Sequence, residues 1–211
     1  MRNIYLINKE RSGKTYRTKI NDASTDNSPA KITGTITEEI GSIGSIEMYV
    51  YANNPGYNVI QPYSSRILAT DQQGNPIFFG RVLRVTPEFS ASGFGRKVIC
   101  ESMIGFLHDQ PVPIQVFNDT IPNILNKVLG LYNKTHSDVW KFDASGIDGE
   151  LLAEKHEIQS EGESLYEFIS NKLFSALGLE MRVWVDGGVV ANDYYQTMYI
   201  GCLLYTSDAA D

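Results

Sequence analysis

The sequence contains few of the residues that build reactive centres. Its 211 residues include two cysteines and three histidines, and the histidines stand far apart at positions 108, 136 and 156. No two of them show the i, i+4 spacing that places two imidazoles on one helix face for a metal ion. We therefore expect no metal site and no cofactor.

Positive charge and long apolar runs are also scarce. The chain has 18 Lys and Arg against 25 Asp and Glu, with a net charge of −7 and a pI near 5.0. Proteins that bind phosphate backbones cluster Lys and Arg, so nucleic-acid-specific binding is not expected. No apolar stretch approaches the roughly 20 residues of a membrane span, and residues 1–16 lack the apolar core of a signal peptide. We expect no membrane span and synthesis in the cytoplasm.

The residues that are abundant favour a folded, β-rich protein. Hydrophobic residues make up 42% of the chain, with 18 Gly, 12 Tyr and 9 Phe. Aromatic side chains suit the half-buried surface of a sheet, and the length allows one large or two small domains.

Alternating apolar and polar residues predict an antiparallel β domain over residues 1–110. Turn residues at 71–76 and at 53–56 end two of the strands, and residues 21–29 and 86–95 are interpreted as connections. We expect the sheet to close on itself, as a barrel does, because closure hides strand edges. The expected strands cover residues 3–7, 15–20, 31–37, 46–51, 66–70, 77–85 and 96–103.

The pattern changes after Pro111 and Pro113, which predict a boundary and an α+β domain over residues 111–201. A first helix, over 118–135, has Thr120 as its cap and Pro122 in its first turn. Its predicted buried face is Ile121, Ile124, Leu125, Val128 and Leu129.

A second helix has Ser160 and Glu163 as a capping box and ends at Gly178. Residues 186–188, Asp-Gly-Gly, predict a tight turn between Leu179–Val185 and a strand from Val189 onward. The predicted buried face of the helix is Leu165, Phe168, Ile169, Leu173, Ala176 and Leu177.

The last ten residues, 202–211, do not continue the strand pattern that precedes them. The string CLLYTSDAAD resembles the translation of a sequencing adapter, so we set it aside from fold reasoning. We expect the natural chain to continue differently after Gly201. Cys100 is then the one native cysteine, and a solitary cysteine in an apolar run is usually a small buried hydrophobe.

Several residue groups could carry chemistry, and each has a simpler explanation. Residues 11–15, Arg-Ser-Gly-Lys-Thr, end like a phosphate-binding loop, but Asn8 stands where that loop needs its first glycine. A hairpin turn is the better interpretation. His108 beside Asp109 could act as a base with its orienting partner, and Cys100 with His108 as a dyad. A loop histidine and a buried strand cysteine explain the same residues.

An acidic group and an aromatic group remain to be considered. Glycosidases use a pair of carboxylates in catalysis, but negative charge near a helix start is also favoured by the helix dipole. The tyrosines could stack on sugars, although strand alternation already explains Tyr49 and Tyr51. The acidic group is Glu150, Glu154, Glu157, Glu161 and Glu163, and the aromatic group is Tyr49, Tyr51, Tyr57 and Tyr63.

Three stretches, taken in order, resemble the N-terminal hub region of siphophage tail-associated lysins, also called prophage tail endopeptidases. Residues 46–63 are IEMYVYANNPGYNVIQPY, an extended strand leading into an Asn-Pro and Tyr turn. Residues 66–85 are RILATDQQGNPIFFGRVLRV, a hairpin that ends in Phe-x-Gly-Arg-Val. Residues 98–109 are VICESMIGFLHD, a Val-x-Cys-Glu strand before a Leu and Asp segment. The later helices and hairpin follow in the same order.

The resemblance implies a baseplate-hub fold with β-barrel-like domains and an α+β domain, assembled as a homotrimer that closes the tail tube of the virion. It also implies contacts with the distal tail protein and the tape-measure protein, and in many relatives a C-terminal peptidoglycan hydrolase. No catalytic residue carries over. The alternatives are part of a peptidoglycan hydrolase and a host-surface glycan-binding module.

Overall fold

The computed structural model describes residues 2–9, 15–22, 32–38, 42–90, 93–135, 141–143, 153–185 and 197–204. The chain divides into two compact units. The described residues of the first unit fall within 2–103, and those of the second fall within 104–185 and 197–204, with the gaps given above.

The first unit is a seven-stranded antiparallel sheet in the order β2-β1-β5-β6-β7-β4-β3. Its strands are β1 (Asn3–Lys9), β2 (Thr15–Asn21), β3 (Thr33–Thr37), β4 (Ser45–Tyr51), β5 (Arg66–Thr70), β6 (Pro76–Ser90) and β7 (Gly93–Ser102). The β1–β2 and β5–β6 hairpins confirm two sequence predictions. Most of the loop expected at residues 21–29 lies outside the described residues.

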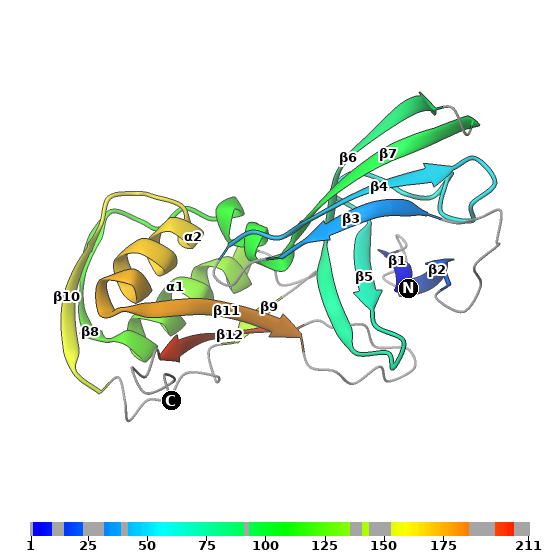
Figure 1. Cartoon of the computed structure of the whole chain (residues 1–211). Coiled ribbons are helices and arrows are strands. Elements are labelled where there is room, and N and C mark those ends of the chain that lie inside the picture. Colours follow the sequence, from blue (N-terminus) through cyan, green and yellow to red (C-terminus); the bar gives the residue numbers. More distant parts are fainter. Residues whose placement is uncertain are drawn as a thin grey trace. The chain divides into compact units, whose positions relative to one another are not determined.

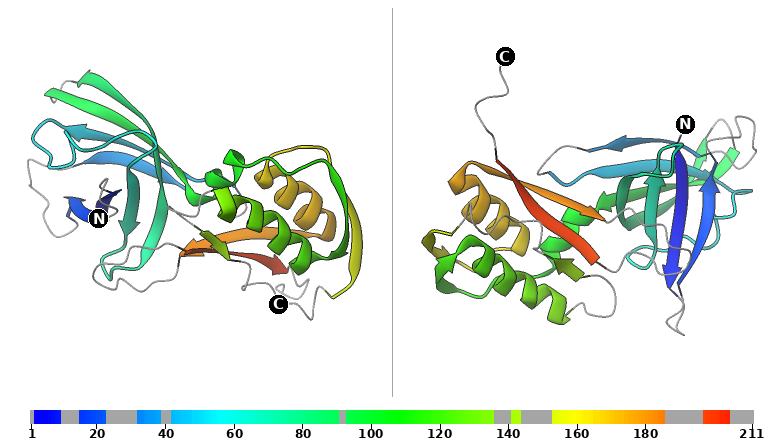
Figure 2. Two further views of the ribbon diagram at one scale, coloured as in Figure 1. Left: turned by 180° about the vertical axis from the view of Figure 1, so that it is seen from behind. Right: turned by 90° about the horizontal axis from the view of Figure 1, so that it is seen from below.

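The main hydrophobic cluster of this unit lies on one face of the sheet, while Ile7, Leu68 and Phe79 are buried on the other face. In β4, Ile46, Met48 and Val50 are buried while Ser45 and Glu47 are exposed, as strand alternation requires. Side chains of β1 and β2 join the same hydrophobic cluster as those of β4, although these strands lie near opposite ends of the sheet order. The sheet is therefore strongly curved (Figure 2). Among the described residues no ladder joins β2 to β3, so closure into a barrel stays a prediction.

The expected connection at residues 86–95 is wrong, because β6 and β7 continue through it as a two-stranded ribbon. Their pairing runs to Ser90 opposite Gly93, and Figure 1 shows the ribbon extending past the end of β5. Pro87 is tolerated in β6 because the described strand β5 pairs with β6 only as far as Arg81. The missing N–H of Pro87 therefore removes no bond of the sheet on that side.

A β-bulge lies at the base of this ribbon. Val82 pairs with Cys100 and Arg84 pairs with Ile99, so Leu83 is an extra residue on β6. Such bulges increase the local twist of a strand pair.

The second unit packs helices against two small sheets (Figures 1 and 2). One sheet pairs β8 with β10, and the other has the order β11-β12-β9, in which β12 and β9 are parallel. Helix α1 contacts β8 and β9, while η2 contacts β10 and β11. The elements are η1 (Met103–Asp109, which begins in the first unit), β8 (Gln115–Thr120), α1 (Ile121–Thr135), β9 (Lys141–Asp143), β10 (Lys155–Ser160), α2 (Leu165–Glu167), η2 (Phe168–Phe174), η3 (Ser175–Leu177), β11 (Leu179–Val185) and β12 (Thr197–Leu204).

Helix α1 buries the face that its sequence predicts. The five residues named above are all buried, together with Tyr132. At its start, the Asp119 carboxylate accepts hydrogen bonds from the Thr120 N–H at 2.9 Å and the Asn123 side chain at 2.8 Å. A side chain one residue earlier than the predicted Thr120 therefore organises this helix end.

The second helix begins later than predicted. Ser164 and Glu167 form its capping box, whereas Ser160 is the last residue of β10. Both pairs have the same spacing, and Gly162 decides between them because its φ of +92° interrupts any helix that starts at Ser160. Wider turns follow, in which the Ser175 N–H bonds the Ser170 carbonyl. Four residues of the predicted buried face, Leu165, Phe168, Ile169 and Leu173, are buried. Phe174 is buried in addition, whereas Leu177 is only partly buried. Gly178 ends the helix with the predicted positive φ.

The last hairpin pairs β11 with β12, and Val185 faces Met198. The Asp-Gly-Gly turn at residues 186–188 lies outside the described residues, and the returning strand is described from Thr197 rather than from Val189. Strand β12 continues through Leu204, so the expected end of the strand pattern at Gly201 is wrong by three residues. The adapter origin of residues 202–211 stays a prediction. No helix among the described residues is both long and apolar enough to cross a membrane.

Candidate functional site

The structure places Cys100 and His108 in different units. Cys100 is 1% exposed in β7, and burial raises the pKa of its thiol well above the usual range. Because the thiolate is the nucleophilic form, this environment suits packing rather than catalysis. His108 is exposed in η1, and its ring lies 4.7 Å from that of Tyr166, centroid to centroid.

The acidic group does not converge at a helix start. Glu157 lies within β10 and Glu154 directly before it, while Glu150 lies outside the described residues. The helix-dipole interpretation is therefore wrong for Glu154 and Glu157. Within the described residues, no three His, Cys, Asp or Glu side chains are grouped to hold a metal ion.

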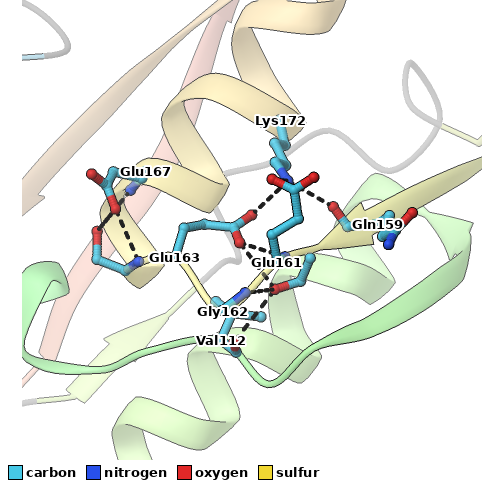
Figure 3. A network of polar contacts seen from close by, with 9 residues as sticks. Val112, Gln159, Glu161, Gly162, Glu163, Glu167 and Lys172 are labelled. Carbon is cyan, nitrogen blue, oxygen red and sulfur yellow. Dashed lines mark hydrogen bonds and ion pairs between the residues drawn. The ribbon is translucent and has the colours of Figure 1, made fainter.

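The remaining carboxylates hold the turn before α2 (Figure 3). The Lys172 ammonium lies 3.2 Å from Glu161 and 3.1 Å from Glu163, and it donates to the Gln159 carbonyl at 3.0 Å. Glu163 also accepts the Glu161 N–H at 2.6 Å. Burial acts to raise the pKa of Glu163, but the backbone donors and Lys172 outweigh it and lower that pKa. These carboxylates have structural partners.

The glycine-lysine-threonine motif is only partly described, since residues 11–14 lie outside the described residues. Thr15 begins β2 and pairs with Lys9 of β1. A phosphate-binding loop is followed by a helix whose N-terminus holds the phosphate. A strand follows here, which favours the hairpin interpretation.

Three of the four tyrosines, Tyr49, Tyr51 and Tyr57, make contacts at or beside the β6–β7 ribbon. The Tyr49 hydroxyl lies within hydrogen-bond distance of the carbonyls of Glu88 (2.9 Å) and Gly93 (3.0 Å), and can donate to one at a time. Its ring meets that of Tyr51 edge-on at 4.8 Å. The Arg96 guanidinium lies 4.3 Å from the centre of the Tyr57 ring and donates to the Tyr57 carbonyl at 2.6 Å.

The end of the ribbon presents two phenylalanines that the sequence analysis missed. Phe89 and Phe94 are direct cross-strand partners, 80% and 52% exposed. The Phe94 ring also contacts the Tyr57 ring at 6.4 Å. We call this pair the aromatic tip. Its sequence signal, an aromatic on each side of a Ser- and Gly-containing turn, was hidden within the expected connection.

A close approach of the backbone fixes the ribbon on β4. A Cβ atom at Gly95 would lie 2.4 Å from Cε1 of Tyr49, so only glycine allows this contact. The ribbon is therefore held at Gly95, one residue below the aromatic tip.

A cleft of about 340 Å³ lies between the two ends of the curved sheet. Five apolar residues of the core and its margin contribute to its lining, and polar side chains complete it. We call it the edge cleft. Its lining residues are Arg2, Ile4, Asn21, Asp22, Ile32, Gly34, Thr35, Ile36, Ile46 and Met48. The cleft depends on sheet curvature that brings β1 near β3, which sequence patterns do not encode locally.

Comparison with known proteins gives a likeness in structure and none in sequence. No family model and no curated protein matches the chain. The 43 kDa tail protein of prophage MuSo2 from Shewanella oneidensis has a TM-score of 0.56 at 19% identity, over 94% of this chain and 54% of that one. Prophage tail protein gp18 of Listeria monocytogenes has a TM-score of 0.53 at 11% identity, over 94% and 50%.

The chain has the fold of prophage tail proteins. A third structure, the Escherichia coli c3393 protein, is described as a type VI secretion component similar to the T4 tail proteins gp27 and gp5. It has a TM-score of 0.53 at 16% identity, over 82% of this chain and 48% of that one. The chain thus spans about half the length of these tail-fold proteins.

Proposed function

We propose that this chain is a structural component of a phage tail tip, corresponding to part of a baseplate hub. The observation that carries the proposal is the likeness to prophage tail proteins, which extends over 94% of the chain. Fold alone does not fix function. The order of the three motifs in residues 46–109 supports the same assignment.

Within this proposal, the chain forms a homotrimer that closes the tail tube, next to the distal tail protein and the tape-measure protein. The neighbours named above are about twice as long as this chain. We propose that the complete protein has a further region, which in related tail proteins can be a peptidoglycan hydrolase. The present residues then serve docking rather than catalysis, as the buried Cys100 and the structurally bonded Glu163 also suggest.

Immunogold electron microscopy tests the proposal. Antibody raised against the purified chain should label phage particles at the tail end farthest from the capsid, because a hub lies there. Labelling of capsids, or particles that contain the protein at no fixed position, would contradict a tail-tip role.

Zymography on bacterial cell walls tests the enzymatic alternative. The purified chain is expected to produce no clearing. Clearing that disappears in Cys100→Ala or His108→Ala would show a hydrolase and overturn the docking proposal.

A further inference from the structure

We propose that copies of this chain associate head to tail, with the aromatic tip of one copy against the outer face of the β8–β10 sheet of another copy. The tip belongs to the first unit and the β8–β10 sheet to the second, so each copy carries both surfaces. The proposal deepens the tail-tip function and rests on it for its biological setting.

The two units carry charge of opposite sign, which selects the partner. Residues 1–103, the bulk of the first unit, contain 12 Lys and Arg against 9 Asp and Glu. Residues 104–201, the bulk of the second, contain 6 Lys and Arg against 14 Asp and Glu. Complementary charge speeds association and suppresses wrong pairings. A contact between unlike units of two copies is therefore favoured over a contact between like units.

Exposed apolar side chains form one pair on each unit. Six large hydrophobic side chains are exposed in the described part of the chain, and four of them belong to these two pairs. Phe89 and Phe94 are the aromatic tip. Ile114 and Val116, which are 76% and 58% exposed, lie at the start of β8. Single exposed hydrophobic residues are ordinary, whereas adjacent ones form patches that mark contact surfaces.

The ribbon face that carries the aromatic tip also carries a positive charge. Side chains two residues apart on a strand share a face, so Arg96 lies on the same face as Phe94. Glu88 directly precedes Phe89 and therefore lies on the opposite face. The Arg96 guanidinium lies over the Tyr57 ring and donates to the Tyr57 carbonyl. It is thus held beside the tip.

The tip is also held in place before any partner binds. The Tyr49 hydroxyl bonds the backbone at the end of the ribbon, and the Tyr57 ring contacts that of Phe94. A preorganised anchor loses less conformational entropy on binding than a flexible one. Removing aromatic rings from water then contributes to the free energy of binding.

The outer face of the β8–β10 sheet has carboxylates beside its apolar pair. Val116 is directly opposite Gln159, and Glu157 shares this face because it is two residues from Gln159. Ile114 lies against Gly162, since a Cβ atom there would be 3.4 Å from Cγ1 of Ile114. The residue before Gly162 is Glu161, whose side chain is 75% exposed.

Basic side chains near this face do not cancel its negative charge. Lys172 lies 3.2 Å from Glu161 and 3.1 Å from Glu163, so one ammonium is shared by two carboxylates. Lys155 lies on the same face as Glu157, at the far end of β10. Three carboxylates and two ammonium groups leave a net negative charge, opposite to that of Arg96 beside the aromatic tip.

A tip on one unit and its binding surface on the other give a heterologous contact. Copies joined in this way form a closed ring if the rotation between them closes, and an open filament if it does not. A closed ring of three copies would be the homotrimer proposed above.

Light scattering after size-exclusion chromatography, over a concentration series at low salt, measures the contact. The complete chain should form oligomers. Phe89→Ser with Phe94→Ser removes the tip, and Val116→Lys places a positive charge at an exposed position of the β8–β10 face. Each of these variants should be monomeric, because every contact loses one of its two surfaces.

Two control variants make matched changes elsewhere. Tyr63→Asn removes an aromatic ring that is 65% exposed, at a φ of +60° that asparagine tolerates. Asn126→Lys adds the same charge as Val116→Lys at an exposed position of α1. Both should assemble like the original chain, and circular dichroism of every variant should match that of the original. Loss of assembly in Asn126→Lys would contradict a local contact.

Mixing the two monomeric variants tests the direction of the contact. The tip variant keeps an intact β8–β10 face and Val116→Lys keeps an intact tip, so the mixture should form dimers and nothing larger. If two tips bound each other instead, Val116→Lys would remain oligomeric, and the inference would be wrong.

Salt tests the choice of a second copy as the partner. High ionic strength screens exposed charges, so the oligomers should dissociate toward monomers as sodium chloride is raised. Oligomers that are as stable at high salt as at low salt would remove the charge argument and overturn the inference.

Two further results would overturn it: a monomeric original chain at all concentrations, or a mixture of variants that stays monomeric. Phe89→Ser and Ile114→Lys, at the more exposed position of each pair, replace the first variants if these misfold. None of these results depends on the immunogold labelling. Failure of this contact and failure of the tail-tip proposal can therefore be told apart.

Discussion

Individual residues in the first unit stabilise the sheet outside its apolar core. Arg81 and Glu101 are cross-strand partners on β6 and β7, and their side chains are 14% and 16% exposed, with Nε and Oε1 2.5 Å apart. Lys97 and Glu47 form a second ion pair at 2.6 Å, with exposures of 37% and 60%. Both pairs join a basic side chain to a glutamate, and they differ in their contact with water.

Glu101→Ala should therefore lower the free energy of unfolding by about 1.5–3 kcal/mol, because it leaves the largely buried Arg81 guanidinium without its carboxylate. Glu47→Ala should cost less than about 1 kcal/mol, as exposed ion pairs do. Urea denaturation of both variants measures the difference. Equal losses would contradict this ranking.

Replacing two glycines by alanine should change the stability of the protein in opposite directions. Gly95→Ala should destabilise the first unit, because the new Cβ would collide with the Tyr49 ring. Gly130 is exposed within α1 and its Cβ would meet no atom within 4 Å. Gly130→Ala should therefore stabilise the protein by about 1 kcal/mol through helix propensity. Thermal unfolding followed by circular dichroism should show shifts of opposite sign.

At the scale of elements, strand alternation and helix periodicity predicted most of the fold. The apolar alternation of β4 and the single apolar face of α1 are visible in the sequence because each depends on local spacing alone. The β6–β7 ribbon was not predicted, since Pro87, Gly93 and Gly95 resemble loop residues. Pro87 can lie in β6 because β5 does not pair with β6 at that point. Gly95 is required in β7 because it lies against the ring of Tyr49, a residue distant in the sequence.

The start of the second helix was ambiguous for a similar reason. Ser160 with Glu163 and Ser164 with Glu167 have identical spacing, and the backbone of Gly162 chooses between them. The aromatic tip and the edge cleft could not be predicted, because both require knowledge of which strands end first and of how far the sheet curves.

The capping box gives a prediction at this scale. Ser164→Ala should destabilise the second unit by about 1 kcal/mol, because it removes the oxygen that accepts the Glu167 N–H at 3.2 Å. Ser164→Asp should restore most of the loss, since aspartate also accepts this bond. Denaturant unfolding monitored by fluorescence provides the measurement, and no loss in Ser164→Ala would refute the role of the cap.

Across the described part of the molecule, three of the four carboxyl groups with a lowered pKa lie in the second unit. Hydrogen bonds from Asn123 lower the pKa of Asp119, and those from Ser164 lower that of Glu167. Glu163 is lowered as well. In the first unit the shifts oppose one another, because a hydrogen bond from Asn75 lowers the pKa of Asp71 while burial raises that of Glu38.

Acid should therefore loosen the second unit before the first. A carboxyl whose folded pKa is lowered contributes stability above its unfolded pKa, near 4, and loses it as the pH falls through the folded pKa. Glu38 has the opposite sign. Hydrogen exchange at acidic and neutral pH, resolved by peptide, should show earlier loss of protection in residues 104–185 than in residues 45–102. Simultaneous loss would refute the prediction.

The bulge at Leu83 changes the direction of the ribbon without changing its pairing. Val82 pairs with Cys100 and Arg84 with Ile99, and every later residue of β6 follows in step down to Phe89 opposite Phe94. Removing Leu83 would leave these pairs intact, and directly opposite residues share a face, so the two rings would stay together. The added twist of the bulge would be lost, so one spare residue sets where the outer end of the hairpin points and not what it displays.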